Sequence, residues 1–303
     1  MDTRKSTFIQ ELSRISDVNL SILPMHTKEL YANPVLCYHV FMIMHSSGMV
    51  EVSVGDTTIS AKDLLVAVVA SRPDYFMPYY FMAVYLAKDS FRSNITKIQQ
   101  SLITSLSYNE MFAKTWHLMS KTIFDWHSVV IVNGKEYTKR DLLLEGFRHC
   151  DTDPAILNDV GVMLHQTGSG GIKLSNGQFL TATGVFVRAL SISPRVGRIY
   201  YNLGYHIDRD ETVNLYDTEN VCKKDLLRYA ILYEPKFAPA YVALACIMEK
   251  DDKIQLTGDI YHTADDLIKL SFLCSLPPDM PIAPSLPGSD SESLFVSFST
   301  LTL

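Results

Sequence analysis

The stretch that decides the fold runs from Ile172 to Ile207 and reads IKLSNGQFLTATGVFVRALSISPRVGRIYYNLGYHI. Two short apolar runs flank Asn176-Gly177, a pair that accepts the positive φ values of a tight turn, so they predict a β-hairpin. Two segments with helical apolar patterning follow, and Pro194 stands between them. Proline at that point predicts a turn joining two helices. The same order recurs along the chain, so the stretch predicts a repeat.

The residue that begins the helix after each hairpin recurs at a nearly fixed period. The five predicted starts are Ser60, Thr138, Thr181, Cys222 and Thr263, and the last four are spaced 43, 41 and 41 residues apart. Three residues later stand Asp63, Asp141, Gly184, Asp225 and Asp266. A hydroxyl followed by an acid at this spacing is a helix N-terminus signal. The first gap of 78 residues leaves room for one further helix pair without a hairpin.

A hairpin signal precedes each predicted start. The predicted tips are Gly55-Asp56, Asn133-Gly134, Asn176-Gly177, Asp217-Thr218 and Gly258-Asp259. Each flanking strand has only about three or four residues, too short to be stable alone. We therefore expect the hairpins along one edge of a helical array.

Large and small side chains also recur in the second part of each unit. The turn positions are Pro73, Asp151, Pro194 and Pro235; six residues later stand Tyr79, Leu157, Tyr200 and Tyr241, and four residues further Ala83, Gly161, Gly204 and Ala245. Trp116 and Ser120 fit the unit without a hairpin, after a helix predicted over about 96–107, and a weaker copy is predicted over 34–45. A large residue four positions from a small one lets two helices approach closely. The sequence predicts a mainly α fold, an α-solenoid of about six antiparallel helix pairs with short inserted β-hairpins.

These residues resemble the tetratricopeptide repeat, whose unit pairs two antiparallel helices over 34 residues. Tyr200, Leu203 and Gly204 match its first helix, and Phe186 and Ala189, followed by proline, match its second. The resemblance covers roughly residues 34–274 and departs from the family in the inserted hairpin, which lengthens the period to about 41. It implies a scaffold for protein–protein interaction.

Three regions follow from this pattern. Residues 1–33 are expected to be a lead-in that caps the first apolar face, residues 34–274 the repeat array, and residues 275–303 a proline- and serine-rich flexible tail. The tail ends in LFVSFSTLTL, whose alternating apolar residues predict a strand. We favour a tail that folds back on the array, or an edge hairpin, over a motif that adds a strand to a partner.

Composition excludes several classes of partner. The 303 residues are 47% hydrophobic and 20% charged, with a formal net charge of −6 and no basic stripe, which argues against a nucleic-acid surface. No leader-like apolar stretch or run of about 18 apolar residues is present, so we expect no membrane partner. The five cysteines form no C-x-x-C, which argues against a disulfide framework or zinc site and favours the cytoplasm.

The sequence contains no catalytic motif. The glycine-rich stretch 167–171 follows a predicted helix and leads into a strand, the reverse of a phosphate-binding loop. No Walker, H-E-x-x-H or G-x-S-x-G pattern occurs, and the histidines lack ligand spacing. We expect no catalytic, cofactor-binding or metal-binding residues and no cofactor. A less favoured alternative is an enzyme with a pocket near His117 or His127.

The resemblance places the binding groove on the first helix of each pair. The candidate partner-binding residues are Tyr80, His117, Asp159, Arg198, Tyr201, Asn202 and Tyr205. Asn202 stands where peptide-carboxylate-binding members of the family carry an asparagine, but Asp159, one unit earlier, has the wrong charge for that role. Packing between helices is an equal alternative for the two tyrosines. We expect a non-catalytic scaffold for a protein or peptide; the alternative is a structural subunit that contacts an assembly through its hairpin edge.

Overall fold

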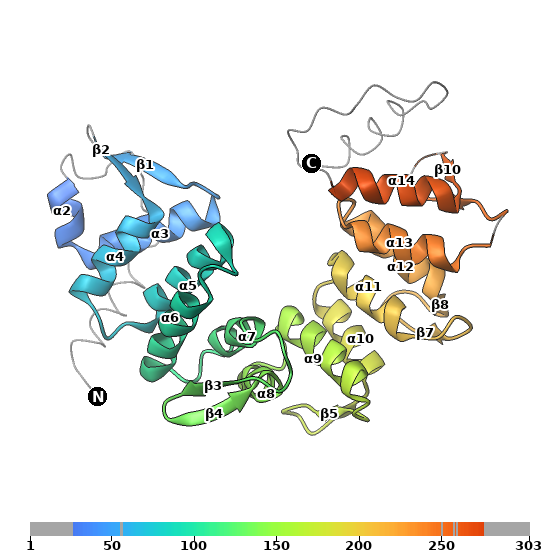
Figure 1. Cartoon of the computed structure of the whole chain (residues 1–303), viewed down its shortest axis with the longest axis horizontal. Helices are drawn as coiled ribbons and strands as arrows, with labels where there is room; N and C mark the ends of the chain where they lie inside the picture. The colour runs from blue at the N-terminus through green and yellow to red at the C-terminus, as the bar shows by residue number, and fades with distance from the viewer. Residues whose placement is uncertain (1–26, 55–56, 250, 257, 259, 276–303) are drawn as a thin grey trace. The chain divides into compact units, whose positions relative to one another are not determined.

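The computed structural model describes residues 27–54, 57–249, 251–256, 258 and 260–275. The chain divides into two compact units, residues 1–150 and 151–303, and each is taken by itself. Within each unit, helices follow one another in antiparallel pairs (Figure 1). No described helix is long and apolar enough to cross a membrane. The predicted lead-in before residue 27 and the predicted tail beyond residue 275 lie outside the described residues.

The first unit contains three helix pairs. Its elements are α2 (Thr27–Ala32), α3 (Pro34–Ser46), β1 (Glu51–Val54), β2 (Thr57–Ser60), α4 (Ala61–Ser71), α5 (Phe76–Ser90), α6 (Ile95–Tyr108), α7 (Ala113–Lys121), β3 (Val129–Val132), β4 (Lys135–Thr138) and α8 (Lys139–His149). The pairs are α3/α4, α5/α6 and α7/α8, and the short α2 packs against α3 and α4. No hairpin separates α5 from α6, as the long first gap in the repeat predicts.

The second unit contains three more pairs. Its elements are α9 (Pro154–Thr167), β5 (Ile172–Lys173), β6 (Phe179–Leu180), α10 (Ala182–Ile192), α11 (Gly197–His206), β7 (Thr212–Val213), β8 (Val221–Cys222), α12 (Lys223–Tyr233), α13 (Ala238–Ile247), β9 (Ile254–Gln255), β10 (Tyr261–His262) and α14 (Ala264–Ser275). The pairs are α9/α10, α11/α12 and α13/α14, and each pair also contacts the next. The predicted mainly α fold of about six helix pairs with inserted hairpins is confirmed.

The predicted helix starts are the N-caps of the second helices. Thr138 and Asp141 form a reciprocal capping box, in which the Asp141 amide donates to the Thr138 hydroxyl at 3.2 Å and the Thr138 amide donates to the Asp141 carboxylate at 3.0 Å. Ser60 begins α4 in the same way. Thr181 keeps only half of the box because residue 184 is glycine. These bonds satisfy amides that the helix itself leaves unpaired.

The large residue six positions after each turn ties the first helix back to that turn. The hydroxyl groups of Tyr79, Tyr200 and Tyr241 donate to the carbonyls of the turn prolines at 2.9, 2.9 and 2.8 Å. Trp116 makes the equivalent bond from its indole N–H to the Glu110 carbonyl at 2.7 Å. Leu157 has no polar group that could make this bond. In its unit the turn residue Asp151 is bonded instead to the hairpin, because its carboxylate accepts from the Ser175 amide at 2.6 Å. The recurring aromatic residue thus fixes the angle between turn and helix.

The small residue of the first helix makes room for a large one of the second. At Gly161 an added Cβ would stand 2.7 Å from the ring of Phe186, and at Gly204 it would stand 3.2 Å from Leu226. Phe186 and Leu226 are fully buried. The close approach predicted from the large–small spacing is therefore present in both pairs.

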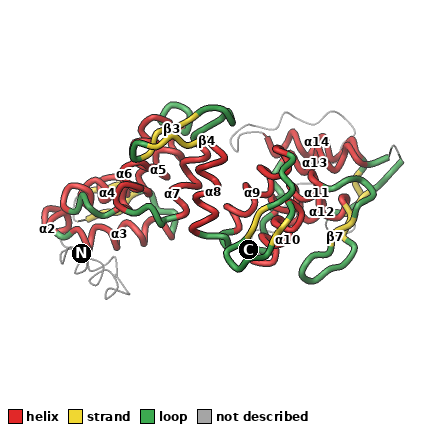
Figure 2. Tube along the Cα trace, turned by 90° about the horizontal axis from the view of Figure 1, so that it is seen from below, coloured by secondary structure: helices red, strands yellow, loops and turns green. Residues whose placement is uncertain are grey.

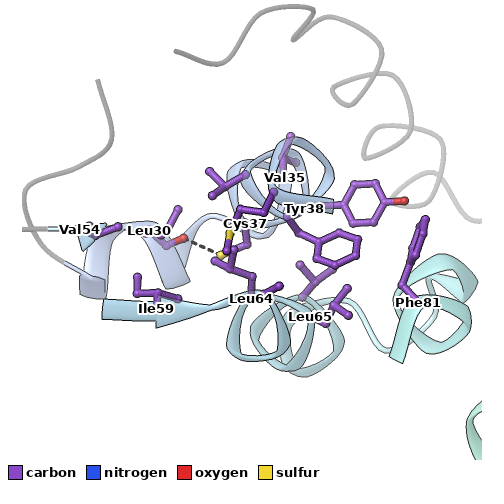
Figure 3. Packing of buried hydrophobic residues seen from close by; sticks show 14 of the residues in the cluster. Leu30, Val35, Cys37, Tyr38, Val54, Ile59, Leu64, Leu65 and Phe81 are labelled. Atoms are coloured by element: carbon purple, nitrogen blue, oxygen red, sulfur yellow. Dashed lines mark hydrogen bonds between the residues drawn. The ribbon is translucent and has the colours of Figure 1, made fainter. Parts of the chain in front are cut away.

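The core of the first pair includes its hairpin. Leu64 and Leu65 of α4 pack with Cys37 and Tyr38 of α3, and Ile59 of β2 joins the same cluster (Figure 3). The Cys37 thiol donates to the Leu30 carbonyl of α2 at 3.1 Å. An apolar residue of each short strand is thereby buried against helices, which supplies the support that a two-stranded hairpin lacks alone.

Each hairpin is a separate two-stranded antiparallel sheet, and no described strand pairs with another hairpin. In Figure 2 the β3–β4 hairpin lies outside the helices of the first unit. Asn133 and Gly134 both have positive φ, as the Asn-Gly tip predicts. The prediction for Asn176-Gly177 is wrong: only Gly177 has positive φ, and its amide donates to the Leu174 carbonyl, so the loop is longer. In the β7–β8 loop the positive φ falls on Asn220 and not on Asp217-Thr218.

Replacing Gly161 with alanine should destabilise the second unit. The added methyl group must displace the buried Phe186 ring, and overpacking of this kind costs about 1–3 kcal/mol. Gly170→Ala is the matched control, because nothing lies within 4 Å of the added Cβ. Urea unfolding of both variants measures the difference; equal stability would contradict the close packing.

Candidate binding face

A hollow on the second unit, of about 780 Å³, is the candidate binding site. Its lining comes from α11, α12, α13 and α14: Tyr201, Tyr205, Lys223, Leu227, Ala238, Pro239, Val242, Ala243, Cys246, Ile247, Ile268, Ser271 and Phe272. We call it the α11–α14 groove. Most of its lining is apolar, and it contains two of the predicted site residues, Tyr201 and Tyr205.

The sequence of α13 explains why the groove is apolar. The helix reads APAYVALACI and contains no charged residue. Tyr241 and Leu244 are buried on one side, whereas Val242 and Cys246 are exposed on the groove side. A helix that is apolar all round is normally covered on all sides. The exposed side of α13 is therefore an unusual surface for a folded protein.

Two tyrosines form the wall on α11. The rings of Tyr201 and Tyr205 stack with centroids 6.2 Å apart, and Tyr201 also meets the edge of Phe237 at 5.1 Å. Burial, followed by the neighbouring Tyr205, raises the pKa of Tyr201 above its ordinary value. Tyr205 is exposed. Tyr201 thus packs between helices and borders the groove at once, and Tyr205 offers its ring to solvent.

The only lysine of the lining, Lys223, is turned to the protein. Its Nζ donates to the Ile207 carbonyl, the C-cap of α11, at 2.9 Å. This bond satisfies a carbonyl that the end of α11 leaves unpaired. The groove therefore presents mainly apolar and aromatic surface to a ligand.

Arg198 pairs with a residue of the neighbouring helix. Its Nε lies 3.2 Å from a Glu234 carboxylate oxygen, and its guanidinium stands 5.4 Å from the centre of the Phe237 ring. The side chain of Arg198 remains 68% exposed. An exposed ion pair of this kind contributes little stability, so Arg198 can exchange this partner for another.

Asn202 belongs to a polar chain between α9 and α11. Its Nδ2 donates to the Asn158 side-chain oxygen at 2.8 Å, and the Asn158 Nδ2 donates to Asp159 at 3.2 Å. Asn202 and Asp159 are half-buried. The amide group that would hold a peptide carboxylate is thus already donated within the protein. Asn202 joins adjacent repeats and lines no part of the α11–α14 groove.

Two histidines make a second contact between the same helices. Nδ1 of His206 on α11 lies 2.6 Å from Nδ1 of His165 on α9, and its Nε2 lies 3.1 Å from the Thr183 hydroxyl of α10. Burial, then the neighbouring His165, lowers the pKa of His206, against an opposing effect of Asp208 and Glu211. One ring must donate and the other accept at this distance, so a second proton would break the contact.

The remaining predicted residues, Tyr80 and His117, lie in the first unit. Tyr80 on α5 is half-buried between the rings of Phe81 and Phe112, with centroids 5.3 and 5.1 Å away. His117 on α7 is half-buried as well. We expected all seven residues to be exposed on the first helices, but only Arg198 and Tyr205 are exposed. Contacts with neighbouring residues account for this burial at Tyr80, which meets Phe112, and at Asn202, which meets Asn158.

Sequence reasoning missed the part of the groove on α13 and α14. Val242, Cys246, Ile268 and Phe272 are not among the predicted site residues, because an apolar residue at helical spacing is normally buried. The one available signal was the unbroken apolar composition of α13. Among the described residues, no group of three histidine, cysteine or acidic side chains is placed to hold a metal ion.

No protein-family model and no curated protein sequence matches the chain. Among solved structures it is similar to the crystal structure of YrrB, a TPR protein with an unusual peptide-binding site. The two chains are 10% identical, the match covers 61% of this chain and 82% of that chain, and the TM-score is 0.40. A likeness at that TM-score is weak. The repeat architecture is seen directly in the successive helix pairs of this chain.

The stability of the second unit should fall as the pH is lowered below about 6.5, the ordinary pKa of histidine. Because the folded-state pKa of His206 is lowered, the unfolded chain takes up its proton first and is favoured. Above the ordinary pKa both states are neutral and the stability is complete. Urea unfolding between pH 5 and pH 8 measures this loss, in a window of about 1.5 pH units on either side of that value.

His206→Gln should make this pH dependence shallower. It should not abolish it, because burial also lowers the pKa of His262 in the same unit. An NMR titration of His206 with a midpoint at or above 6.5 would contradict the contact with His165.

Proposed function

We propose that the chain is a non-catalytic scaffold that binds a protein or peptide in the α11–α14 groove. The observation that carries the proposal is the exposed apolar surface of Tyr205, Val242 and Phe272 around one hollow. Contiguous apolar surface beside a concavity is typical of an interaction site. Aromatic side chains are the usual anchors of such interfaces.

The lining restricts the chemistry of the partner. Lys223 is the one charged residue of the lining, and its Nζ donates to a backbone carbonyl, so the groove offers few ionic contacts to an acidic or basic ligand. Arg198 lies on the same helix as the two tyrosines but outside the lining, where it pairs with Glu234. A segment with two or more apolar anchors and little charge fits this surface best.

The class of repeat is also part of the proposal. The turn prolines, the tyrosines bonded to them and the large–small contacts support a hairpin-bearing variant of the tetratricopeptide repeat. The five free cysteines fit a reducing compartment, and we place the protein in the cytoplasm. Of the seven residues predicted to bind the partner, Tyr201 and Tyr205 are kept as groove residues. Asn202 and Asp159 are proposed only to hold helices of the second unit together, Tyr80 and His117 only to pack within the first unit, and Arg198 only to pair with Glu234.

A structural role through the hairpins is the second candidate. Three hairpins of the second unit each expose an aromatic side chain: Phe179, Tyr216 and Tyr261. Tyr216, in the β7–β8 loop, is 88% exposed. Exposed aromatic residues repeated on successive hairpins would suit a lateral contact in an assembly.

Affinity purification of the tagged full-length protein separates these candidates. Tyr205→Ala combined with Val242→Asp should abolish recovery of a stoichiometric partner, because both side chains are exposed and line the groove. The matched control, Phe179→Ala with Tyr216→Ala, removes exposed aromatic surface from the hairpins and should leave recovery unchanged. The opposite pattern would reject the groove and favour the structural role.

A further inference from the structure

The outer face of α14 differs from the same face of the earlier second helices. The side chain nine residues after the N-cap is Leu190 on α10, Ile231 on α12 and Phe272 on α14. Leu190 is 4% exposed and Ile231 is 1% exposed, whereas Phe272 is 68% exposed. The first two helices are each packed against the next first helix, α11 and α13. The described residues contain no helix that follows α14.

The side chain five residues after the N-cap is likewise more buried on α10 and α12 than on α14. Phe186 and Leu227 are fully buried at this position, but Ile268 on α14 is only half-buried. Ile268 and Phe272 therefore form the apolar surface that elsewhere receives the next unit. Terminal repeats of a helical array normally carry a polar outer face. The apolar character of this face indicates that some other segment covers it.

The sequence after α14 has the composition to do so. It reads LPPDMPIAPSLPG over residues 276–288, which contains Met280, Ile282 and Leu286. In the repeat, the position of Pro235 corresponds to residue 276, so residues 279–288 stand in the register of α13. The chain thus enters this segment where a seventh first helix would begin.

The prolines of this sequence argue against the first helix of a seventh pair. Pro281, Pro284 and Pro287 recur at every third residue, and proline inside a helix removes a hydrogen bond and clashes with the preceding turn. A spacing of three is instead the period of the polyproline II helix, which places the three rings on one side. Such segments bind in grooves lined by aromatic side chains. Tyr201, Tyr205 and Phe272 provide that lining.

We propose that residues 277–287 of the chain cover the α11–α14 groove as a polyproline II segment. The segment begins two residues after Ser275, the end of α14. So short a connection gives an effective concentration in the millimolar range, which lets a weak contact be occupied. A polyproline II segment also loses little conformational entropy on binding, because it is already extended. An apolar partner of the same groove then has to displace this segment.

Cys246 allows a direct test, because its thiol lines the groove. The full-length protein is treated with a maleimide, and the rate of modification of each cysteine is read by peptide mass spectrometry. Pro281→Asp with Pro284→Asp should raise the rate at Cys246 by about tenfold, because both prolines lie on the side of the segment that binds the groove and the tethered segment then leaves it. Cys222, outside the groove lining, is the internal reference and should keep its rate.

A matched variant further along the chain identifies the segment. Leu294→Asp with Val296→Asp introduces the same charges in the terminal apolar stretch and should leave the Cys246 rate unchanged. Addition of a synthetic peptide of residues 276–288 should restore protection to the first variant. Overturning results are an unchanged rate in the first variant, a faster rate in the second, or protection that grows with protein concentration, which would indicate a second copy.

The test contains no external partner, so it is independent of the proposed function. Groove occupancy by residues 277–287 with no partner recovered from cells would leave this inference intact and reject the scaffold role. Recovery of a partner together with an unprotected Cys246 would support the scaffold role and reject the covering of the groove by residues 277–287.

Discussion

The structure depends on one contact, the seating of a large apolar side chain of each second helix against a small residue of the first. Phe186 against Gly161 and Leu226 against Gly204 are two examples of it. The contact brings the helices near enough to bury the rest of the stripe, which neither helix could bury alone. The hairpins need the helices in turn, because a short two-stranded hairpin is not stable alone and residues such as Val213 and Val221 are buried.

The groove lies where the packing of one helix pair against the next has no further pair among the described residues. Along the second unit, each second helix is covered on one side by its own first helix and on the other by the next one. At α14 the second cover is missing among the described residues, and the side chains that would receive it, Ile268 and Phe272, border the hollow. A repeat that buries its interior between neighbours thus creates a recognition surface wherever a neighbour is absent. The surface carries the apolar chemistry of a core, which is why its proposed ligands are apolar segments.

Structural features that recur at a fixed period could be predicted from the sequence. Features that belong to one repeat only could not. The capping residues, such as Thr138 with Asp141, recur at one spacing and give local hydrogen bonds, so the helix starts were predicted correctly. The turn at Asn176-Gly177 was not, because loop length and not the residue pair decides the turn type. The exposure of Asn202 was also misjudged, since it depends on Asn158 in the preceding repeat. The exposure of Phe272 could not be predicted, because the period of the repeat carries no information on whether a neighbouring unit follows.

Hydrogen–deuterium exchange of the full-length protein, read by mass spectrometry, tests the packing between helix pairs most directly. Amide exchange requires local opening, so it reports which helices are covered on both sides. The account predicts that α10 and α12 exchange most slowly in the second unit, and that the β7–β8 loop around Tyr216 exchanges fastest. Exchange of α12 as rapid as that of this loop would contradict the mutual burial of successive helix pairs.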